Sequence, residues 1–254
     1  LQKELPNYCC FVAMPEEARP IMRRFGSCRE ERAGRFPVYY FTAGGRRIAM
    51  IRSGMGTNKA TAATEQLIAV ANPCVIISAG FGGAVRPGLD TGDVVIADQY
   101  LFLDKESPKT AGTLENEPLL NALREPYPTR PFRIVTGATV TTGGIIPKKS
   151  ADHIIPREVT NPLLDMETSA VALVASRNGI PLVAVRAVSD PADEELLFSL
   201  DEITDRDLNI SLIRVFLAIA KKPRILPQML RLAKNAKRAG KNLALVVEQV
   251  AHVV

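Results

Sequence analysis

The amino-acid sequence predicts an α/β fold in which helices cover both faces of a central sheet. Two observations carry this prediction. Apolar runs of strand length recur along the chain and are separated by segments of helical period, as in sheets that are buried on both faces. A chain of 254 residues, of which 46% are hydrophobic and 23% charged, is long enough for one large globular domain and does not require two.

The elements of the first half follow from the alternation of apolar runs with turn residues. Pro15 and Gly26 bracket a helical segment, since proline suits a first helical turn and glycine suits a helix end. Gly44 and Gly45 separate two apolar runs that we expect to pair as a hairpin. The expected strands cover residues 8–14, 36–45, 46–54, 74–80 and 92–102, and the expected helices cover residues 15–26 and 57–72.

A long connection separates the two halves of the chain. Residues 104–131 are rich in Pro, Glu, Thr and Lys, with a short helix expected at 118–126. Such connections are usually mobile surface, and they are also where active-site lids occur. A strand at 132–142 follows this connection.

The next segment combines a helix with a strand that is expected at the centre of the sheet. Four apolar residues have the spacing of one helix face, and these are Met166, Ala170, Leu173 and Val174. The helix is expected to stop at Gly179. The strand at 180–190 then carries Asp190 to its carboxyl end, the side on which open α/β sheets bind ligands.

The net charge of +5 is unevenly distributed. Residues 221–241 contain eight Lys or Arg and no acid, so the rest of the chain has a net charge of about −3. The basic character therefore belongs to one C-terminal segment, and the body of the protein is not expected to bind nucleic acid.

Cysteine and histidine usage narrows the chemistry. The four cysteines form neither a disulfide framework nor a CxxC pattern, which fits a reducing cytoplasm. The start of the sequence lacks the layout of a signal peptide, and no run approaches the roughly 20 apolar residues that span a bilayer. His153 and His252 are the two histidines, and neither lies near another metal ligand at motif spacing. We therefore expect chemistry based on carboxylates.

Two glycine-rich turns have both a structural and a functional interpretation. Residues 79–85 follow a strand, but Val85 occupies the third glycine position of a dinucleotide fingerprint, and a turn and a strand follow instead of a helix. The cluster indicates either tight packing or close approach by a ligand. Residues 53–60 end a strand and open a helix, which is typical of an ordinary connection and also of sites for anions and hydroxyl groups.

The candidate acids have the same two interpretations. Glu16, Glu17 and Glu167 lie at expected helix starts, where acids complement the helix dipole. Asp190 ends a strand and precedes Pro191, so it is either a turn residue or a site acid.

Five motifs follow the order found in the nucleoside phosphorylase and nucleosidase superfamily. They lie at residues 13–18, 53–60, 77–98, 135–142 and 165–193, and the last is the most specific. Over residues 8–215 the chain resembles this superfamily, and within it most closely the methylthioadenosine/S-adenosylhomocysteine nucleosidases. The resemblance implies a single-domain, three-layer α/β/α sandwich with a twisted mixed sheet, assembled as a homodimer or a larger oligomer.

The resemblance also implies a role for each acid. Asp190, helped by Ser189, would protonate N7 of the departing adenine, which requires a pKa above the reference value of about 3.9. Glu17 would position or deprotonate the attacking water. Glu167 would accept hydrogen bonds from the ribose 2′- and 3′-hydroxyls, and Met166 would pack on the sugar. Further nucleoside contacts are expected from Ser53, Gly54, Gly80, Phe81 and Val140.

Three features depart from the family pattern. Phosphorylases carry a phosphate-binding arginine where this chain has residues 77–80, which favours hydrolysis, although Arg19 and Arg46 lie near other phosphate positions. Val140 replaces a phenylalanine that packs on adenine, and Phe81 replaces a small residue. The catalytic domain is expected to cover residues 1–215, and a basic amphipathic helical extension is expected at 216–254. This extension is similar to the tails of hopanoid-associated members of the superfamily. A solvated helix or an oligomer contact explains it equally well.

The sequence thus predicts hydrolytic release of adenine from a 5′-substituted adenosine, with water as co-substrate and with neither a metal nor an organic cofactor. The open alternatives are a lipid-linked adenine nucleoside as substrate, phosphorolysis with phosphate as co-substrate, and a nucleoside-binding module without turnover. A cytoplasmic location is expected, with peripheral membrane contact through residues 221–241 under the lipid-linked alternative.

Overall fold

The structure is a computed structural model that describes residues 8–43, 46–104, 107–114, 121, 131–194, 215, 217–218 and 221–253. The predicted hairpin turn at Gly44 and Gly45 lies outside these ranges, as does the short helix predicted at 118–126 apart from Asn121. The described strands are β1 (Tyr8–Val12), β2 (Arg29–Ala33), β3 (Phe36–Ala43), β4 (Arg46–Arg52), β5 (Ile76–Ala84), β6 (Val94–Leu103), β7 (Pro108–Thr113), β8 (Ile134–Thr141), β9 (Leu163–Asp165) and β10 (Leu182–Asp190). The described helices are α1 (Pro15–Phe25), α2 (Thr57–Ala71), α4 (Lys148–Ile154), α5 (Thr168–Arg177), the 3₁₀ turn η1 (Pro223–Ile225) and α8 (Leu226–Val253).

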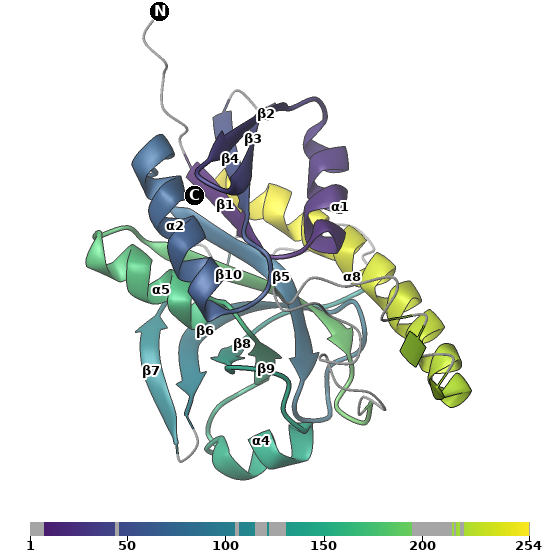
Figure 1. The fold of residues 1–254 in the computed structure, drawn as a ribbon. Coiled ribbons are helices and arrows are strands. Elements are labelled where there is room, and N and C mark those ends of the chain that lie inside the picture. Colours follow the sequence, from purple (N-terminus) through teal and green to yellow (C-terminus); the bar gives the residue numbers. More distant parts are fainter. Residues whose placement is uncertain are drawn as a thin grey trace, which may run out of the picture.

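The described strands form one mixed sheet (Figure 1). Strands β4, β1, β5 and β10 run parallel, and β3 pairs antiparallel with β4, which confirms the predicted hairpin pairing. Strands β5, β10, β6, β8 and β9 close into a ring, because β9 pairs with both β8 and β5. Since parallel strands end at the same edge, the segments that follow Val12, Arg52 and Asp190 emerge close together.

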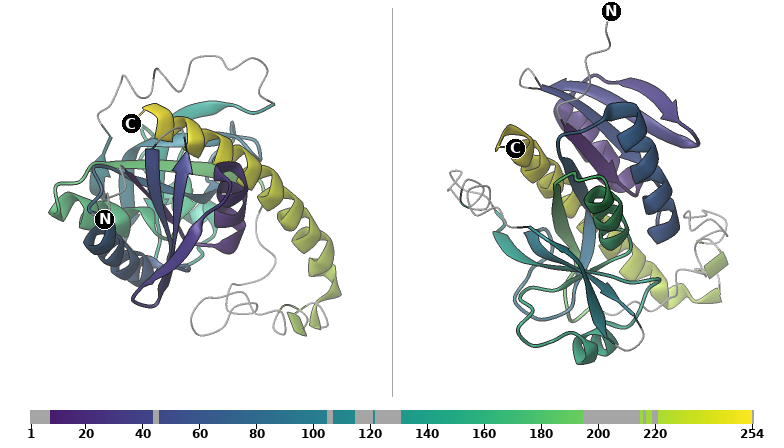
Figure 2. Two further views of the ribbon diagram at one scale, coloured as in Figure 1. Left: turned by 90° about the horizontal axis from the view of Figure 1, so that it is seen from above. Right: turned by 90° about the vertical axis from the view of Figure 1, so that its left-hand side faces the viewer.

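Helices cover both faces of the sheet, so the predicted three-layer arrangement is confirmed (Figures 1 and 2). On one face, α1 and α8 pack against the sheet through apolar side chains that include Ile21 and Val247. On the other face, α2 and α5 do the same, with Leu67 and Val171 fully buried. The periodic apolar residues of these helices thus produce two cores, one on each side of the strands.

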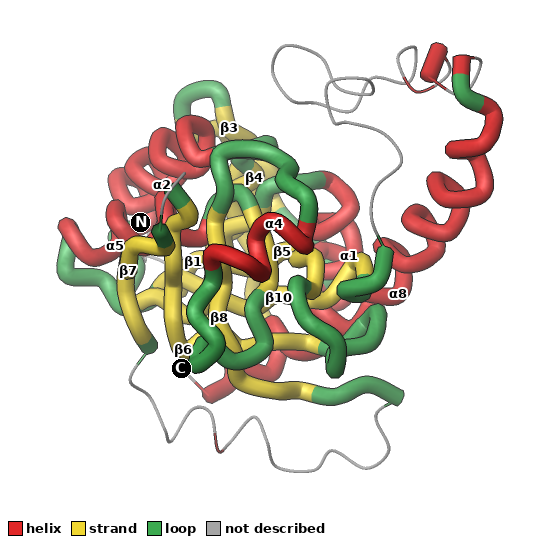
Figure 3. Tube along the Cα trace, turned by 90° about the horizontal axis from the view of Figure 1, so that it is seen from below, coloured by secondary structure: helices red, strands yellow, loops and turns green. Residues whose placement is uncertain are grey.

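The short helix α4 covers one end of the strand ring and was not predicted. It lies at the bottom of the molecule in Figure 1 and in front of the strands in Figure 3. Ala151 of α4 and Ile155, the residue that follows the helix, pack with Val140 of β8 in a separate apolar cluster. Seven residues are too few for a clear helical period, which explains why the sequence did not indicate it.

The structure differs from the prediction in several further places. Strand β5 continues through the glycines to Ala84, and strands β2, β7 and β9 were not predicted. The helix expected to include Met166 begins at Thr168, so Met166 lies before it. Leu173, expected on the buried face of α5, is 46% exposed.

Helix α8 is built from two different halves. Its second half lies in the core, where Leu243, Val247 and Val250 are fully buried beside α1 and β10. Its first half extends beyond the body of the molecule (Figures 1 and 2), and Leu226 and Leu230 are exposed there. The predicted boundary between residues 215 and 216 therefore separates segments that the fold packs together. None of the helices in the described part of the chain is long and apolar enough to cross a membrane.

Gly240 sets the distance between α8 and the start of α1. A β-carbon at this position would lie 2.9 Å from Cγ of Pro20 and 3.2 Å from the carbonyl oxygen of Glu16. We expect Gly240→Val to lower the free energy of unfolding by about 1–3 kcal/mol, because overpacking would push the two helices apart. Urea unfolding measures the change.

The exposed Lys241→Val in the same helical turn is the control, because it introduces the same side chain without the clash. Valine is a better helix former than glycine and a poorer one than lysine, so helix propensity alone would favour Gly240→Val over the control. Equal losses in the two variants would show that the close helix contact contributes nothing.

Candidate functional site

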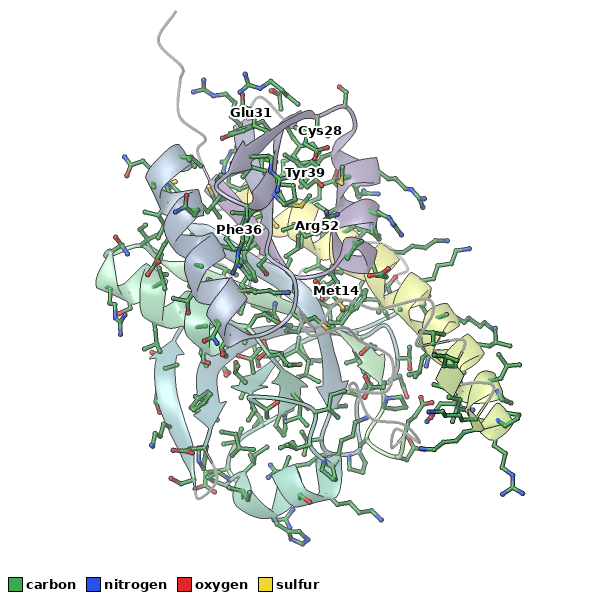
Figure 4. All side chains as sticks on the ribbon, viewed as in Figure 1. Met14, Cys28, Glu31, Phe36, Tyr39 and Arg52 are labelled. Atoms are coloured by element: carbon green, nitrogen blue, oxygen red, sulfur yellow. The ribbon has the colours of Figure 1, made fainter. Side chains whose placement is uncertain are left out.

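The carboxylate of Glu17 is buried at the carboxyl end of β1. Its Oε2 accepts hydrogen bonds from the amides of Ala13 and Met14, at 2.9 and 2.8 Å. Its Oε1 accepts from the amide of Phe81 on β5, at 2.9 Å. Figure 4 labels Met14 at the junction of β1 and α1. The neighbouring Glu16 is exposed and lies 3.9 Å from Arg19, so of the two acids only Glu17 turns inward.

Gly80 of β5 makes room for this carboxylate. A β-carbon on Gly80 would lie 3.0 Å from Oε1 of Glu17 and 3.4 Å from the guanidinium carbon of Arg186. Because only glycine leaves this space open, the sequence cluster at 79–85 is explained here by the close approach of protein side chains.

Glu167 lies between the end of β9 and the start of α5. Its Oε1 accepts from the amide of Gly56 at 2.8 Å, and its Oε2 accepts from the amide of Met166 at 3.3 Å. Gly54 and Gly56 have φ values of 82° and 100°, which favour glycine, and this turn brings the Gly56 amide to Glu167. The turn is held against β1, because the amide of Ser53 donates to the carbonyl of Val12.

The guanidinium of Arg186 is buried between the two glutamates and Asp165. Arg186 donates to Oδ2 of Asp165 at 3.0 Å, to the carbonyl and hydroxyl oxygens of Ser78 at 2.7 and 2.9 Å, and to the hydroxyl of Thr168 at 2.6 Å. Both side chains of the Arg186–Asp165 pair are almost inaccessible to solvent. Thr141 also donates to Asp165, so the pair is satisfied on every side.

Burial raises the proton affinity of both glutamates. Loss of solvent, followed by the charges of Asp165 and Glu17, raises the pKa of Glu167 to about 8. Burial also raises the pKa of Glu17, against the opposing effects of its amide hydrogen bonds and of Arg186. Three buried carboxyl groups around one cation favour the uptake of a proton, so this cluster can hold or accept protons near neutrality.

Asp190 lies at the end of β10 with both carboxyl oxygens occupied. Its Oδ1 accepts from the hydroxyl of Ser189 at 2.6 Å, and its Oδ2 lies 2.5 Å from Nζ of Lys148. A β-carbon on Gly83 would lie 2.7 Å from Oδ2, so a second glycine of β5 makes room for a second acid. The charged group that the structure places against Asp190 is a cation and not the neighbouring acid that the sequence analysis considered.

A family model for the phosphorylase superfamily matches residues 7–221. The chain belongs to the phosphorylase superfamily. Its curated relatives include a 5′-methylthioadenosine/S-adenosylhomocysteine nucleosidase from Listeria monocytogenes, 28% identical over 206 residues that cover 75% of this chain and 88% of the relative. Another nucleosidase of that name, from Actinobacillus succinogenes, is 26% identical over 203 residues, with coverage of 75% and 88%.

Solved structures of the superfamily share the fold. A Helicobacter pylori 5′-methylthioadenosine/S-adenosylhomocysteine nucleosidase superposes with a TM-score of 0.74 at 16% identity and covers 99% of this chain and 100% of its own. The futalosine hydrolase of Helicobacter pylori superposes with a TM-score of 0.73 at 17% identity, with coverage of 98% and 99%. The nucleosidase of the first structure is in complex with a pyrrolidin-3-ol that carries an amino-pyrrolopyrimidine group. At these identities the superpositions show the fold.

Some of the residues predicted to contact the nucleoside or a phosphate do not lie with the acids in this superfamily member. Val140 has no exposed surface and packs in the apolar cluster under α4. Arg46 begins β4, at the edge of the sheet opposite Ser53, and its guanidinium donates to the carbonyl of Ala251. The side chain of Arg19 is 66% exposed. The ring of Phe81 points toward α8, since its Cζ would lie 3.5 Å from a β-carbon on Gly240. The structure therefore does not bring Val140 or the two arginines to the acids.

Three residues of the site were missed from the sequence: Arg186, Asp165 and Lys148. A charged residue within the apolar strand 180–190 was the signal for Arg186, because a buried arginine needs a carboxylate partner. Lys148 gave no signal, since it lies beside Lys149 in a polar stretch. In the described part of the chain, no three His, Cys, Asp or Glu side chains are grouped so as to hold a metal ion.

The raised pKa of Glu167 makes stability depend on pH. Because the pKa is about 8 in the folded chain and 4.5 for the ordinary group, its contribution to stability is fully present below pH 4.5 and is lost as the pH rises through 8. We expect Glu167→Gln to remove this loss, so that between pH 5 and 9 the variant gains about 1–3 kcal/mol relative to the native protein.

Urea unfolding at pH 5, 7 and 9 measures this gain. The exposed Glu65→Gln on α2 is the control and should follow the native curve. If the free energies of unfolding of Glu167→Gln and the native protein changed in parallel with pH, the raised pKa of the buried Glu167 carboxyl group would be contradicted.

Proposed function

We propose that this protein hydrolyses the N-glycosidic bond of a 5′-substituted adenosine and releases adenine. The observation that carries the proposal is the convergence of Glu17, Glu167 and Asp190 from three segments at the edge of the sheet where β1 and β10 end. The nucleosidases that share 88% of their length with this chain supply the substrate class.

The chemistry of glycosidic cleavage fits two groups of acids. Positive charge develops on the ribose and negative charge on the departing base, so acids are needed on both sides of the bond. Glu17 accepts a proton from the attacking water, and burial raises the pKa of its carboxyl group, which makes the carboxylate a stronger base. Glu167 accepts hydrogen bonds from the ribose hydroxyls. Asp190 delivers a proton to N7 of the purine.

The positions of the arginines support water over phosphate as the co-substrate. No arginine occurs at 77–80, Arg46 lies at the far end of β4, and the side chain of Arg19 points into solvent beside Glu16. Phosphate carries about two charges at neutral pH and is usually bound by paired arginine or backbone donors. Release of free ribose, and not of ribose 1-phosphate, is the expected product pattern.

Base release from defined nucleosides tests this proposal. The substrates are methylthioadenosine, S-adenosylhomocysteine, adenosine and inosine, each with and without phosphate. We expect adenine from the 5′-substituted adenosines, and a fall of about 10²–10⁴-fold in kcat for Asp190→Asn, because the variant cannot deliver a proton.

The exposed Asp193→Asn, three residues along the same segment, is the control and should keep native turnover. Native activity in Asp190→Asn would contradict the role of Asp190. Ligand binding without base release by the native chain would favour the nucleoside-binding module.

The projecting half of α8 favours a second candidate substrate, an adenine nucleoside carried on a lipid. Lys234, Lys237 and Lys241 are exposed at spacings of three and four residues and so share one face of the helix. Exposed Leu226 and Leu230 add apolar surface to the same half. Basic helices of this kind bind anionic lipid surfaces, at about 1 kcal/mol per Lys or Arg near the surface.

Vesicle binding separates this candidate from the first. We expect the native chain to co-sediment with vesicles of phosphatidylglycerol but not of phosphatidylcholine, and the triple change of these lysines to Ala to abolish binding, because the attraction is electrostatic. A charge-matched control replaces the exposed Arg23, Lys149 and Arg177 by Ala. Equal binding by the two triple variants would contradict a lipid-facing helix.

A further inference from the structure

Lys148, the first residue of α4, is a buried lysine in contact with the proposed acid. Its side chain is 8% exposed, and lysine is rarely buried to this degree unless it is paired. The missing side chain of Gly83 makes room for it, because a β-carbon there would lie 3.3 Å from Cε of Lys148. The family resemblance assigned this lysine no role.

The ammonium group of Lys148 has three acceptors for its three protons. Nζ lies 2.5 Å from Oδ2 of Asp190, 2.5 Å from the carbonyl oxygen of Pro191 and 3.3 Å from the carbonyl oxygen of Asp190. The other carboxyl oxygen, Oδ1, accepts from Ser189. Both oxygens of Asp190 thus have a hydrogen-bond donor beside them, and the donor at Oδ2 is the ammonium group of Lys148.

We propose that Lys148 is a positioning residue that supplies, through Asp190, the proton which the departing purine receives. The inference rests on the proposed function and names the source of a proton that this function requires. Ser189 keeps Oδ1 as an acceptor, so the proton from Lys148 arrives on Oδ2.

The transfer balances in two steps. One N–H bond of the ammonium breaks, and its proton forms an O–H bond on Oδ2 of Asp190, leaving a neutral amine and a neutral carboxylic acid. This O–H bond then breaks as the proton passes to N7, while the electron pair of the glycosidic bond goes to the purine ring. Asp190 returns to a carboxylate, and the amine of Lys148 regains a proton from solvent after the base leaves.

The surroundings of Lys148 suit this transfer. A bound nucleoside excludes water from Asp190, whose side chain is 18% exposed in the free protein, and an ion pair loses stability relative to its neutral form as water leaves. Lysine is suited to giving up a proton in such a site, whereas arginine is always charged. The two carbonyl acceptors keep the amine in place in both states.

Substrates that differ in their need for a proton test the inference. A purine nucleoside requires protonation of its leaving group, whereas 4-nitrophenyl β-D-ribofuranoside releases a stable anion without it. The variants are Lys148→Met, which lacks the proton, and Lys148→Arg, which keeps the charge but not the transferable proton. The exposed neighbour Lys149→Met is the control.

We expect both Lys148 variants to lose about 10²-fold or more of kcat on the purine nucleoside and less than threefold on the nitrophenyl riboside. Lys149→Met should match the native protein on both substrates. Equal losses on the two substrates, or native activity of Lys148→Arg on the purine nucleoside, would overturn the inference, because pairing alone would then explain the lysine.

Thermal unfolding of each variant verifies that it folds, and Lys148→Arg, which retains a cation for Asp190, is the variant expected to fold if Lys148→Met does not. Failure of the proposed function itself has a different signature, because the native chain would then release no base from any of the four nucleosides. That result would also exclude the proton transfer from Lys148.

Discussion

The guanidinium of Arg186 occupies the centre of a buried group of carboxyl side chains, and the geometry of the site depends on it. It contacts Ser78 on β5, Asp165 at the end of β9 and Thr168 at the start of α5. One side chain of β10 therefore ties β5 to the junction between β9 and α5, and these two segments are distant in sequence. Breaking a buried pair of this kind typically costs about 3–5 kcal/mol, because a charge is left without a partner. Glu17 and Glu167 are held on either side by backbone amides, and both sense the charge of Arg186.

The glycines of β5 explain how so many polar groups fit beside a closed ring of strands. Gly80 gives space to Glu17 and Arg186, and Gly83 gives space to Asp190 and Lys148. Strand β5 therefore lies beside two acidic groups. Glu17 and Glu167 have raised proton affinity, whereas Asp190 is held in an ion pair with Lys148. Two acids in different environments match the two tasks of glycosidic cleavage, at the sugar and at the base.

The sequence predicted the parts of the fold that have a clear period or clear turn residues. The strand at 8–14, the helix at 15–26 and the hairpin strands appear with limits shifted by a few residues. It did not predict α4, β7 or β9, which are too short for periodicity to identify. It also missed β2, whose charged residues are mostly exposed and form no apolar run. It also placed Met166 and Leu173 on a buried helix face, whereas Met166 precedes α5 and Leu173 is exposed on it. Apolar spacing shows neither where a helix begins nor which part of its surface other elements cover.

Three acids of the site were named as candidates from the sequence, but Asp165 was missed together with the two cations, Arg186 and Lys148. Glu17 and Asp190 follow strands that the sequence predicts, Glu167 lies at a predicted helix start, and Glu17 and Glu167 are buried in the structure. Lys148 reaches Asp190 only because β8 and α4 fold over the end of β10, a contact between elements some forty residues apart that no local pattern encodes. Val140 was named as a nucleoside contact because its position matches a family motif, but in the structure its side chain is enclosed in an apolar cluster.

A crystal structure with a non-hydrolysable 5′-methylthioadenosine analogue tests the central claim most directly, namely that acids from separate segments act on one nucleoside. The account predicts ribose hydroxyls within hydrogen-bond distance of Glu167, C1′ facing Glu17, and N7 of the purine within hydrogen-bond distance of Asp190. A ligand bound elsewhere, with Asp190 paired only to Lys148 and remote from the purine, would contradict it.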